Sequence, residues 1–269
     1  MGTTHLLFHN QGRGRPIGGG GGVPVLPDIA GLELWLDGSD IATLFQDSAK
    51  TTPVTADGDV VGAMADKGDN GNDATQGTTA NKPIYKATIQ NGLSIVRFAV
   101  NDYLEVDALA AIFTGIDKPM TIFAALKQTN NTGTQQVFGV ARGASSNPLF
   151  VLDIATNVNY RLVRRDDAVT LKLLTAGTPD TLAHLLYAEF SGTVGTLRID
   201  SAVIGTPNTD FDLGTLTLDK ATVGARNSLG ALSNYLNGDI YELLVYDSVL
   251  SATNRQLVEV YLNTKWAVY

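Results

Sequence analysis

Apolar side chains occupy every second position in many short segments of this sequence, and this spacing constrains its fold more than any other feature. In GLELWLD the two alternating sets are Leu32, Leu34 and Leu36 against Glu33, Trp35 and Asp37. In PMTIFAALK they are Met120, Ile122, Ala124 and Leu126 against Thr121, Phe123, Ala125 and Lys127. Alternation with a period of two is typical of a strand that buries one of its faces, so both segments are predicted to be strands.

Further segments of this kind follow along the chain, namely QQVFGVA, PLFVLDIA, NYRLVRR, VTLKLL, LAHLLYAEF, GTLRID, TLTLD and DIYELLVYD. Clusters of turn-forming residues separate them, at 130–133, 145–148, 176–180, 205–210 and 237–238. The stretches between strands are too short for crossover helices, so antiparallel pairing is expected. The sequence therefore predicts an all-β, antiparallel, two-sheet sandwich.

One helix is predicted, at the C-terminal end of the chain. Ser251 is a good N-cap residue, because its side chain can accept a hydrogen bond from a free backbone N–H group of the first turn. The residues expected to share one helical face are Leu257, Val258, Tyr261, Leu262 and Trp266. This apolar face should pack against the sandwich.

The first 29 residues differ in composition from the rest of the chain. They contain five consecutive glycines at 18–22 and three prolines, which favour a tether over a packed core. An apolar group and two cations precede the glycines, namely Leu6, Leu7 and Phe8 with Arg13 and Arg15. We interpret residues 1–29 as an extended arm that anchors a domain at 30–269 to a neighbouring protein; a disordered tail is the alternative.

Composition excludes several classes of function. With no cysteine, the chain has neither a disulfide framework nor a thiolate metal site. A net charge of -8 argues against a nucleic-acid partner, which requires a clustered basic face. The densest basic stretch, residues 161–165, is followed at once by Asp166 and Asp167, so we interpret it as a solvated strand end. No apolar run of 18 residues is present, so no membrane-spanning helix is expected.

Two stretches carry a resemblance to a known family. The first is NGDIYELLVYDSVLSATNRQLVEVYLNTKW at 237–266, and the second is GLELWLDGSD at 31–40 together with MADKGDNGNDATQGTTANKPIYKATIQNGLSIVRFAVNDYLEV at 64–106. They resemble the closing and opening segments of concanavalin A-like lectin/glucanase domains, the laminin-G-like jelly rolls of phage and bacterial surface proteins. The resemblance implies one jelly roll, in which the first and last strands pair.

Together with the arm, this resemblance implies a non-enzymatic bacteriophage virion protein, either a capsid decoration or head fibre or a tail-associated component. Its expected location is the virion. Its expected partners are other virion proteins, bound through the arm, and further copies of itself. The alternative is a secreted or surface carbohydrate-binding module, and the weaker one is a glycoside hydrolase. Host surface glycans are possible ligands under either of the first two hypotheses.

The carboxylate residues of this sequence give little support to a catalytic function. The glycoside hydrolases with this fold use the pattern Glu-x-Asp-x-x-Glu, which supplies two carboxylates on one face. The nearest match here begins at Glu105 and Asp107, but Ala110 occupies the position of the last glutamate. Glu189 and Glu242 could converge across a sheet, although outward-facing polar positions explain them equally well. We therefore predict no catalytic residue and no cofactor other than a candidate calcium ion.

The candidate calcium ligands are Asp66, Asp69, Asn70 and Asp73, in a loop dense in oxygen donors and glycine. An Asx-rich, hydrogen-bonded turn is the alternative, and we favour it. The lone strand histidine, His184, is interpreted as a half-buried imidazole with satisfied hydrogen bonds. Aromatic residues that could stack on a sugar are Trp35, Tyr85, Tyr103, Tyr160 and Tyr235, with core packing as the alternative for each.

Overall fold

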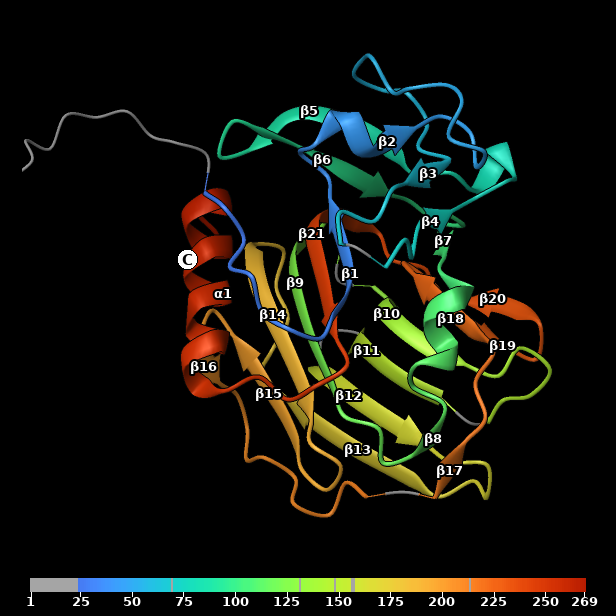
Figure 1. Cartoon of the computed structure of the whole chain (residues 1–269), viewed down its shortest axis with the longest axis vertical. Helices are drawn as coiled ribbons and strands as arrows, with labels where there is room; N and C mark the ends of the chain where they lie inside the picture. The colour runs from blue at the N-terminus through green and yellow to red at the C-terminus, as the bar shows by residue number, and fades with distance from the viewer. Residues whose placement is uncertain (1–23, 69, 131, 148, 156–157, 213) are drawn as a thin grey trace, which may run out of the picture.

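The computed structural model describes residues 24–68, 70–130, 132–147, 149–155, 158–212 and 214–269. Two large sheets stack face to face, with one helix against the outside of one of them (Figure 1). The strand pairs of this part of the chain are antiparallel, which confirms the predicted two-sheet sandwich.

The eight-stranded sheet consists, in spatial order, of β16 (Ala202–Val203), β15 (Gly195–Ile199), β14 (Ala183–Phe190), β9 (Met120–Gln128), β21 (Gly238–Tyr246), β6 (Leu93–Phe98) and β5 (Ile84–Gln90), with β1 (Leu32–Asp37) also paired to β21. The nine-stranded sheet consists of β13 (Leu171–Ala176), β12 (Asn159–Arg165), β11 (Leu149–Ala155), β10 (Gln135–Ala141), β18 (Lys220–Val223), β7 (Leu104–Glu105), β4 (Ala74–Thr75), β3 (Ala63–Met64) and β2 (Leu44–Phe45). Two small ribbons pair β17 (Thr215–Leu216) with β8 (Gly115–Ile116) and β19 (Arg226–Ser228) with β20 (Ala231–Ser233). Short 3-10 turns occupy Ile41–Thr43, Thr79–Asn81 and Asp107–Ala111.

The first and last strands of the described chain pair with each other. In this pairing Trp35 of β1 lies opposite Leu244 of β21, and Asp37 lies opposite Glu242. Strand β21 also pairs with β9 along most of its length, which places it at the centre of the eight-stranded sheet. The closure that a jelly roll requires is therefore present.

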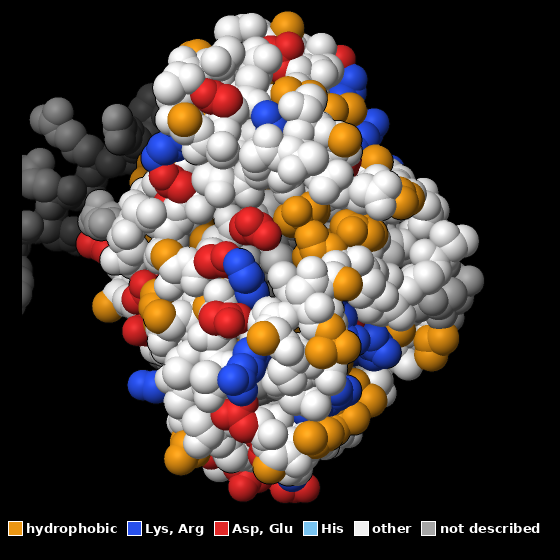
Figure 2. Space-filling view, turned by 90° about the vertical axis from the view of Figure 1, so that its right-hand side faces the viewer, with side chains coloured by type: hydrophobic (Ala, Val, Ile, Leu, Met, Phe, Trp, Pro, Cys, Tyr) orange, Lys and Arg blue, Asp and Glu red, His pale blue; other side chains and the backbone are white. Residues whose placement is uncertain are grey.

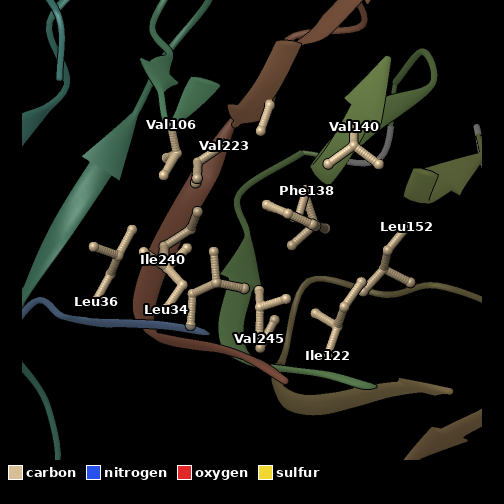
Figure 3. Packing of buried hydrophobic residues seen from close by; sticks show 14 of the residues in the cluster. Leu34, Leu36, Val106, Ile122, Phe138, Val140, Leu152, Val223, Ile240 and Val245 are labelled. Atoms are coloured by element: carbon tan, nitrogen blue, oxygen red, sulfur yellow. The ribbon is translucent and has the colours of Figure 1, made fainter. Parts of the chain in front are cut away.

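The main core fills the space between the two sheets (Figure 3). The eight-stranded sheet contributes Leu34, Leu36, Ile122, Ile240 and Val245, which face Phe138, Val140, Leu152 and Val223 of the nine-stranded sheet. The alternation predicted for 120–127 is confirmed, because Ile122 points into this core while Phe123 points to the helix side. The prediction for Leu32 is wrong: the register shifts between Leu32 and Leu34, so Leu32 packs on the helix side instead.

Helix α1 (Ala252–Trp266) covers the outer face of the eight-stranded sheet (Figure 1). Its N-cap is confirmed, since Ser251 Oγ accepts a hydrogen bond from the backbone N–H of Asn254 at 3.1 Å. Four of the five residues predicted for its buried face are buried, namely Val258, Tyr261, Leu262 and Trp266. Leu257 is 48% exposed, because at about 100° per residue it points roughly 140° away from Leu262. Within the described ranges, no helix is long and apolar enough to cross a membrane.

The segment that leads into β1 packs on the domain. Leu26 and Ile29 fall inside the expected arm, yet both are buried in the cluster between α1 and the sheet. The expected anchoring residues lie outside the described part of the chain, namely Leu6, Leu7, Phe8, Arg13 and Arg15. Anchoring by the arm therefore stays a prediction.

Candidate ligand-binding groove

A groove crosses the outer face of the nine-stranded sheet, over β11, β12 and β13. Its volume is about 150 Å³, and its walls are Leu149, Val151, Asp153, Arg161, Val163, Arg165, Leu171, Leu173 and Arg226. The strand period explains this lining, because outward residues such as Val151 and Val163 alternate with Leu152 and Leu162, which face the core. The open face of this sheet therefore carries a lining distinct from the core behind it.

The floor of the groove is aliphatic. Leu149 and Val151 are buried and pack against Val163, forming a small cluster separate from the main core. On the edge strand, Leu171 is 49% exposed and Leu173 is 43% exposed. Apolar side chains also lie beside basic ones on the face shown in Figure 2, towards its lower right. A ligand in the groove would meet an apolar surface with charged groups at its border.

Two of the three arginines in the groove have partners within the protein. Arg161 binds Asp153 through two parallel contacts, Nε to Oδ1 at 2.6 Å and Nη2 to Oδ2 at 2.6 Å. Burial raises the pKa of Asp153 although Arg161 opposes this shift. Arg165 Nη1 donates a hydrogen bond to Asn147 Oδ1 at 2.7 Å. Because asparagine is uncharged, this bond does not neutralise the charge of Arg165. The groove thus has more positive than negative charge.

Arg226, from β19, is the third arginine. Its Nε is buried and has no hydrogen-bond partner among the described residues. Burial, followed by repulsion from Arg165, lowers the pKa of its guanidinium, although an arginine stays protonated at neutral pH. A buried cation without a counter-charge costs free energy, so an anion bound beside this guanidinium would be stabilised. The arrangement is suited to a carboxylate or another oxyanion.

The interpretation of 161–165 as a solvated strand end is wrong for Arg164. This residue is 2% exposed and lies between the two sheets, because it faces inward from β12 like Leu162 two residues earlier. Its guanidinium lies 3.4 Å from the centre of the Phe190 ring, and Nη1 donates to the Phe211 carbonyl at 2.9 Å. Arg164 is a structural residue, while Arg161 and Arg165 line the groove.

The carboxylates in the candidate calcium loop accept hydrogen bonds from the protein itself. Asp66 Oδ1 accepts from the backbone N–H groups of Trp35 and Gly68, and its Oδ2 accepts from that of Asn72. Asp73 Oδ1 accepts from the Asp66 N–H at 2.9 Å, and its Oδ2 pairs with Lys50.

In the same loop, Asn70 donates from Nδ2 to the Leu32 carbonyl at 2.8 Å, while Asp69 lies outside the described residues. In the part of the chain that the structure describes, no group of three acidic or histidine residues is placed to hold a metal ion. The geometry of the described residues is that of an Asx-rich turn, and calcium binding stays a prediction to be tested.

We expect millimolar Ca²⁺ to leave the melting temperature unchanged, because binding would have to displace the hydrogen bonds that Asp66 and Asp73 accept. Thermal unfolding followed by circular dichroism, with EDTA-treated protein as the reference, measures the effect. A rise of several degrees on adding Ca²⁺ would contradict this expectation, since a ligand that binds only the folded state raises the apparent stability.

The carboxylate pair considered for catalysis does not converge on an open surface. Glu242 is fully buried beneath α1, where its oxygens accept from Trp35 Nε1, Tyr261 OH and Trp266 Nε1, each at 2.7 Å. Glu189 instead accepts from the hydroxyl of Tyr187. A glycoside hydrolase needs both of its carboxylates at the sugar, and Glu242 cannot reach one. In the broken motif, Asp107 pairs with Lys220 and Ala110 is buried.

Of the aromatic residues considered for stacking on sugars, Tyr85 and Tyr160 are buried in the main core. Trp35 is half-buried, and its ring lies under the Lys67 amine, 4.6 Å from the centroid. Tyr103 and Tyr235 are half-buried and lie outside the groove lining. The contact surface in the groove is therefore aliphatic.

His184 lies between two carboxylates at the start of β14. Its Nδ1 lies 2.7 Å from Asp200 Oδ2, and its Nε2 lies 2.9 Å from Asp180 Oδ1. The hydrogen bond with Asp200 raises the pKa of the imidazole, and the one with Asp180 adds to this effect. The predicted half-buried and hydrogen-bonded imidazole is confirmed, with a side chain that is 15% exposed.

This geometry predicts a pH-dependent contribution to stability. The folded-state pKa of His184 is raised above the unfolded value, so the contribution is complete below about pH 6.5 and is lost as the pH rises through the folded pKa. We expect His184→Gln to lower the free energy of unfolding by about 1 kcal/mol at pH 6 and by less at pH 8.5. Urea unfolding of both proteins across this range measures the difference. A difference that did not change with pH would contradict the prediction.

Several solved structures have a fold similar to that of this chain. The CBM40 carbohydrate-binding module of the Ruminococcus gnavus IT-sialidase, in a complex with α2,3-sialyllactose, matches 65% of this chain and 98% of its own, with a TM-score of 0.53 and 16% identity. The leech intramolecular trans-sialidase matches 61% of this chain with a TM-score of 0.52 and 18% identity. The NanB sialidase of Streptococcus pneumoniae, as its K499G mutant, matches 63% with a TM-score of 0.52 and 17% identity.

These likenesses show a lectin-like, jelly-roll β-sandwich. The chain spans nearly the whole of the CBM40 module but only 26% of the leech enzyme and 27% of NanB. Neither the protein-family models nor the curated proteins give a match to this sequence. The link to bacteriophages that the resemblance implied stays a prediction.

Proposed function

We propose that this domain binds a glycan that carries a carboxylate, in the groove over β11–β13. The observation that carries the proposal is the side chain of Arg226, which lines an apolar groove together with Arg161 and Arg165. A guanidinium can bind a carboxylate through two parallel hydrogen bonds. The aliphatic floor from Leu149 to Val163 would then cover the apolar part of the sugar.

Two further observations support an acidic glycan. The groove has an excess of guanidinium groups although the chain as a whole carries a net charge of -8. One module with a similar fold, the CBM40 of the Ruminococcus gnavus IT-sialidase, is seen bound to both α2,3- and α2,6-sialyllactose, whose sialyl residue bears a carboxylate. A positively charged groove on an acidic protein attracts acidic glycans in preference to neutral ones, because complementary charge contributes to the choice of ligand.

We propose binding without hydrolysis. Asp153 is the one carboxylate among the residues that line the groove, and Arg161 holds both of its oxygens. Most glycoside hydrolases use two carboxylates and sialidases use a tyrosine nucleophile, but neither a second carboxylate nor a tyrosine is among the described residues that line this groove. We therefore expect the bound glycan to stay intact.

Calorimetric titration with 3′-sialyllactose, and with lactose as the uncharged control, tests the proposal. We expect binding of sialyllactose that weakens as the salt concentration rises, because charge–charge attraction is screened. We expect no measurable binding of lactose. Equal binding of both sugars, or binding of neither sialyllactose nor any acidic glycan on an array, would contradict the proposal.

The proposed place of such a domain is a virion, where it would serve adsorption to host surface glycans. Attachment through residues 1–29 to capsid or tail proteins, and assembly into homo-oligomers, belong to the same proposal. Size-exclusion chromatography and pull-down with residues 1–29 deleted test it. Unchanged incorporation of the deleted protein into particles would argue against an anchoring arm.

A further inference from the structure

Three charged side chains meet in a closed space beneath α1. Lys265 Nζ lies 2.7 Å from Asp37 Oδ2 and 2.7 Å from Glu242 Oε2. The exposed fractions of the three side chains are 3% for Lys265, 3% for Asp37 and 0% for Glu242. The amine therefore touches two carboxylates in a place that water barely reaches.

The fold brings these residues together from distant parts of the chain. Asp37 ends β1 and lies opposite Glu242 in the register with β21, and Lys265 comes from the last turn of α1. Large rings close the space, because Trp35, Tyr261 and Trp266 all donate to the oxygens of Glu242. The Lys265 amine also lies 4.9 Å from the Trp266 ring. The first strand, the last strand and the C-terminal helix thus meet at one amine.

Further donors hold the Asp37 carboxyl in place. Lys67 Nζ lies 2.8 Å from Oδ2, while the backbone N–H and the hydroxyl of Ser39 donate to Oδ1 at 3.0 and 2.7 Å. Donors on both oxygens draw electron density from the carboxyl carbon and would stabilise negative charge that develops on oxygen during attack. The amine of Lys265 contacts the oxygen one bond away from that carbon, so the groups start close to an attack geometry.

The environment acts in opposite directions on the two carboxyl groups of this cluster. Burial raises the pKa of Asp37, but the charges and hydrogen bonds of Lys265 and Lys67 outweigh this and lower it, so Asp37 needs a proton relay to become neutral. Burial raises the pKa of Glu242, and the negative charge of Asp37 raises it further. This carboxyl therefore accepts a proton more readily than an ordinary glutamate. Exclusion of water also favours a condensation that releases water. A Lys–Asp pair beside a second carboxyl has what an amide-forming reaction requires.

We propose that Lys265 and Asp37 become joined by an intramolecular amide bond, with Glu242 as the proton relay. Glu242 takes a proton from the Lys265 ammonium and passes it to Asp37 Oδ2. The neutral amine then attacks the Asp37 carboxyl carbon, and the new C–N bond forms. A second proton moves from nitrogen through Glu242 to the same oxygen, which leaves as water. The sum converts one ammonium and one carboxylate into one amide and one water, with no other reactant.

The product would tie the first strand of the sandwich to its C-terminal helix. Glu242 would keep its donors, since the amide N–H replaces the ammonium as the fourth donor beside Trp35, Tyr261 and Trp266. This inference does not depend on the glycan proposal, because the cluster lies on the outer face of the eight-stranded sheet and the groove on that of the other sheet.

The intact mass of the full chain tests the proposal. We expect electrospray mass spectrometry of the denatured protein to give a mass about 18 Da below that of the sequence, the mass of one water. Trypsin does not cleave after an acylated lysine, so digestion should yield a branched peptide that joins residues 14–50 to 256–269. A mass equal to that of the sequence would overturn the proposal.

Variants separate this reaction from other losses of water. In Lys265→Arg the full mass should return, because a guanidinium is a poor nucleophile; a loss that persisted would indicate a cyclic imide at Asp37–Gly38 and would overturn the proposal. Glu242→Gln should also keep its full mass, with circular dichroism to show that it folds. Asp37→Asn keeps the reaction but expels ammonia, so its mass should fall by about 17 Da with the same branched peptide. A branch at Lys67 instead of Lys265 would contradict the assignment.

Discussion

Replacing Trp266 with alanine is expected to lower the free energy of unfolding by about 3 to 5 kcal/mol, the range for truncating a large buried aromatic side chain. Trp266 is fully buried, and its ring stacks on Tyr241 with the ring centres 5.3 Å apart. Its indole N–H also donates to Glu242 Oε2 at 2.7 Å. The variant would lose both the packing of α1 on the sheet and one of the donors to a buried carboxylate.

Urea unfolding followed by circular dichroism and fluorescence measures this loss. Leu257→Ala is the matched control, because Leu257 belongs to the same helix but is 48% exposed. We expect the control to change the free energy of unfolding by less than about 0.5 kcal/mol. Equal effects of the two substitutions would mean that α1 does not pack on the sheet through the face described.

Replacing Arg226 with glutamine is expected to weaken the binding of 3′-sialyllactose by about 30-fold or more. Removing one partner of a desolvated charge pair costs about 2 to 5 kcal/mol, and about 1.4 kcal/mol corresponds to a tenfold change in affinity. Glutamine keeps a polar side chain, but it is shorter than arginine and cannot bind a carboxylate as a cation. Because Arg226 Nε has no partner among the described residues, the change should leave the fold intact.

Calorimetric titration of both proteins with 3′-sialyllactose gives the ratio of affinities. Arg142→Gln is the control, since it removes the same charge from an exposed residue that does not line the groove. The control should bind within about twofold of the original protein, because a remote exposed charge acts only through screened long-range attraction. If both variants lost affinity equally, binding would depend on net charge and not on the groove.

Much of the fold could be predicted from local patterns. Alternation in 120–127 correctly placed Ile122 and Phe123 on opposite faces of the strand, and Ser251 was recognised as the cap of α1. These features depend on residues a few positions apart, where strand and helix geometry directly determine which side chains share a face. The errors arose where that geometry is interrupted: a register shift moved Leu32 to the other face, and Leu257 lies beyond the edge of the buried stripe.

The candidate site was missed because its parts come together only through sheet pairing. Arg161 and Arg165 were visible as a basic stretch, but nothing near them in the sequence pointed to Arg226, which reaches the groove from a separate ribbon. The same limit applied to Arg164, whose inward position follows from the register of β12 with its neighbours. The alternation of 160–165 was the one signal that could have separated Arg164 from Arg161 and Arg165.

By itself, the sequence determined the sandwich class, the closing helix and the acidic character of the chain, because periodicity and composition act locally or as sums over residues. Only the tertiary structure decided that Arg226 joins Arg165, and that Asp37, Glu242 and Lys265 share one closed space. Such contacts between distant residues depend on strand order, register and the path of α1 over the sheet. These follow from the packing of the whole chain, and no short stretch of residues specifies them.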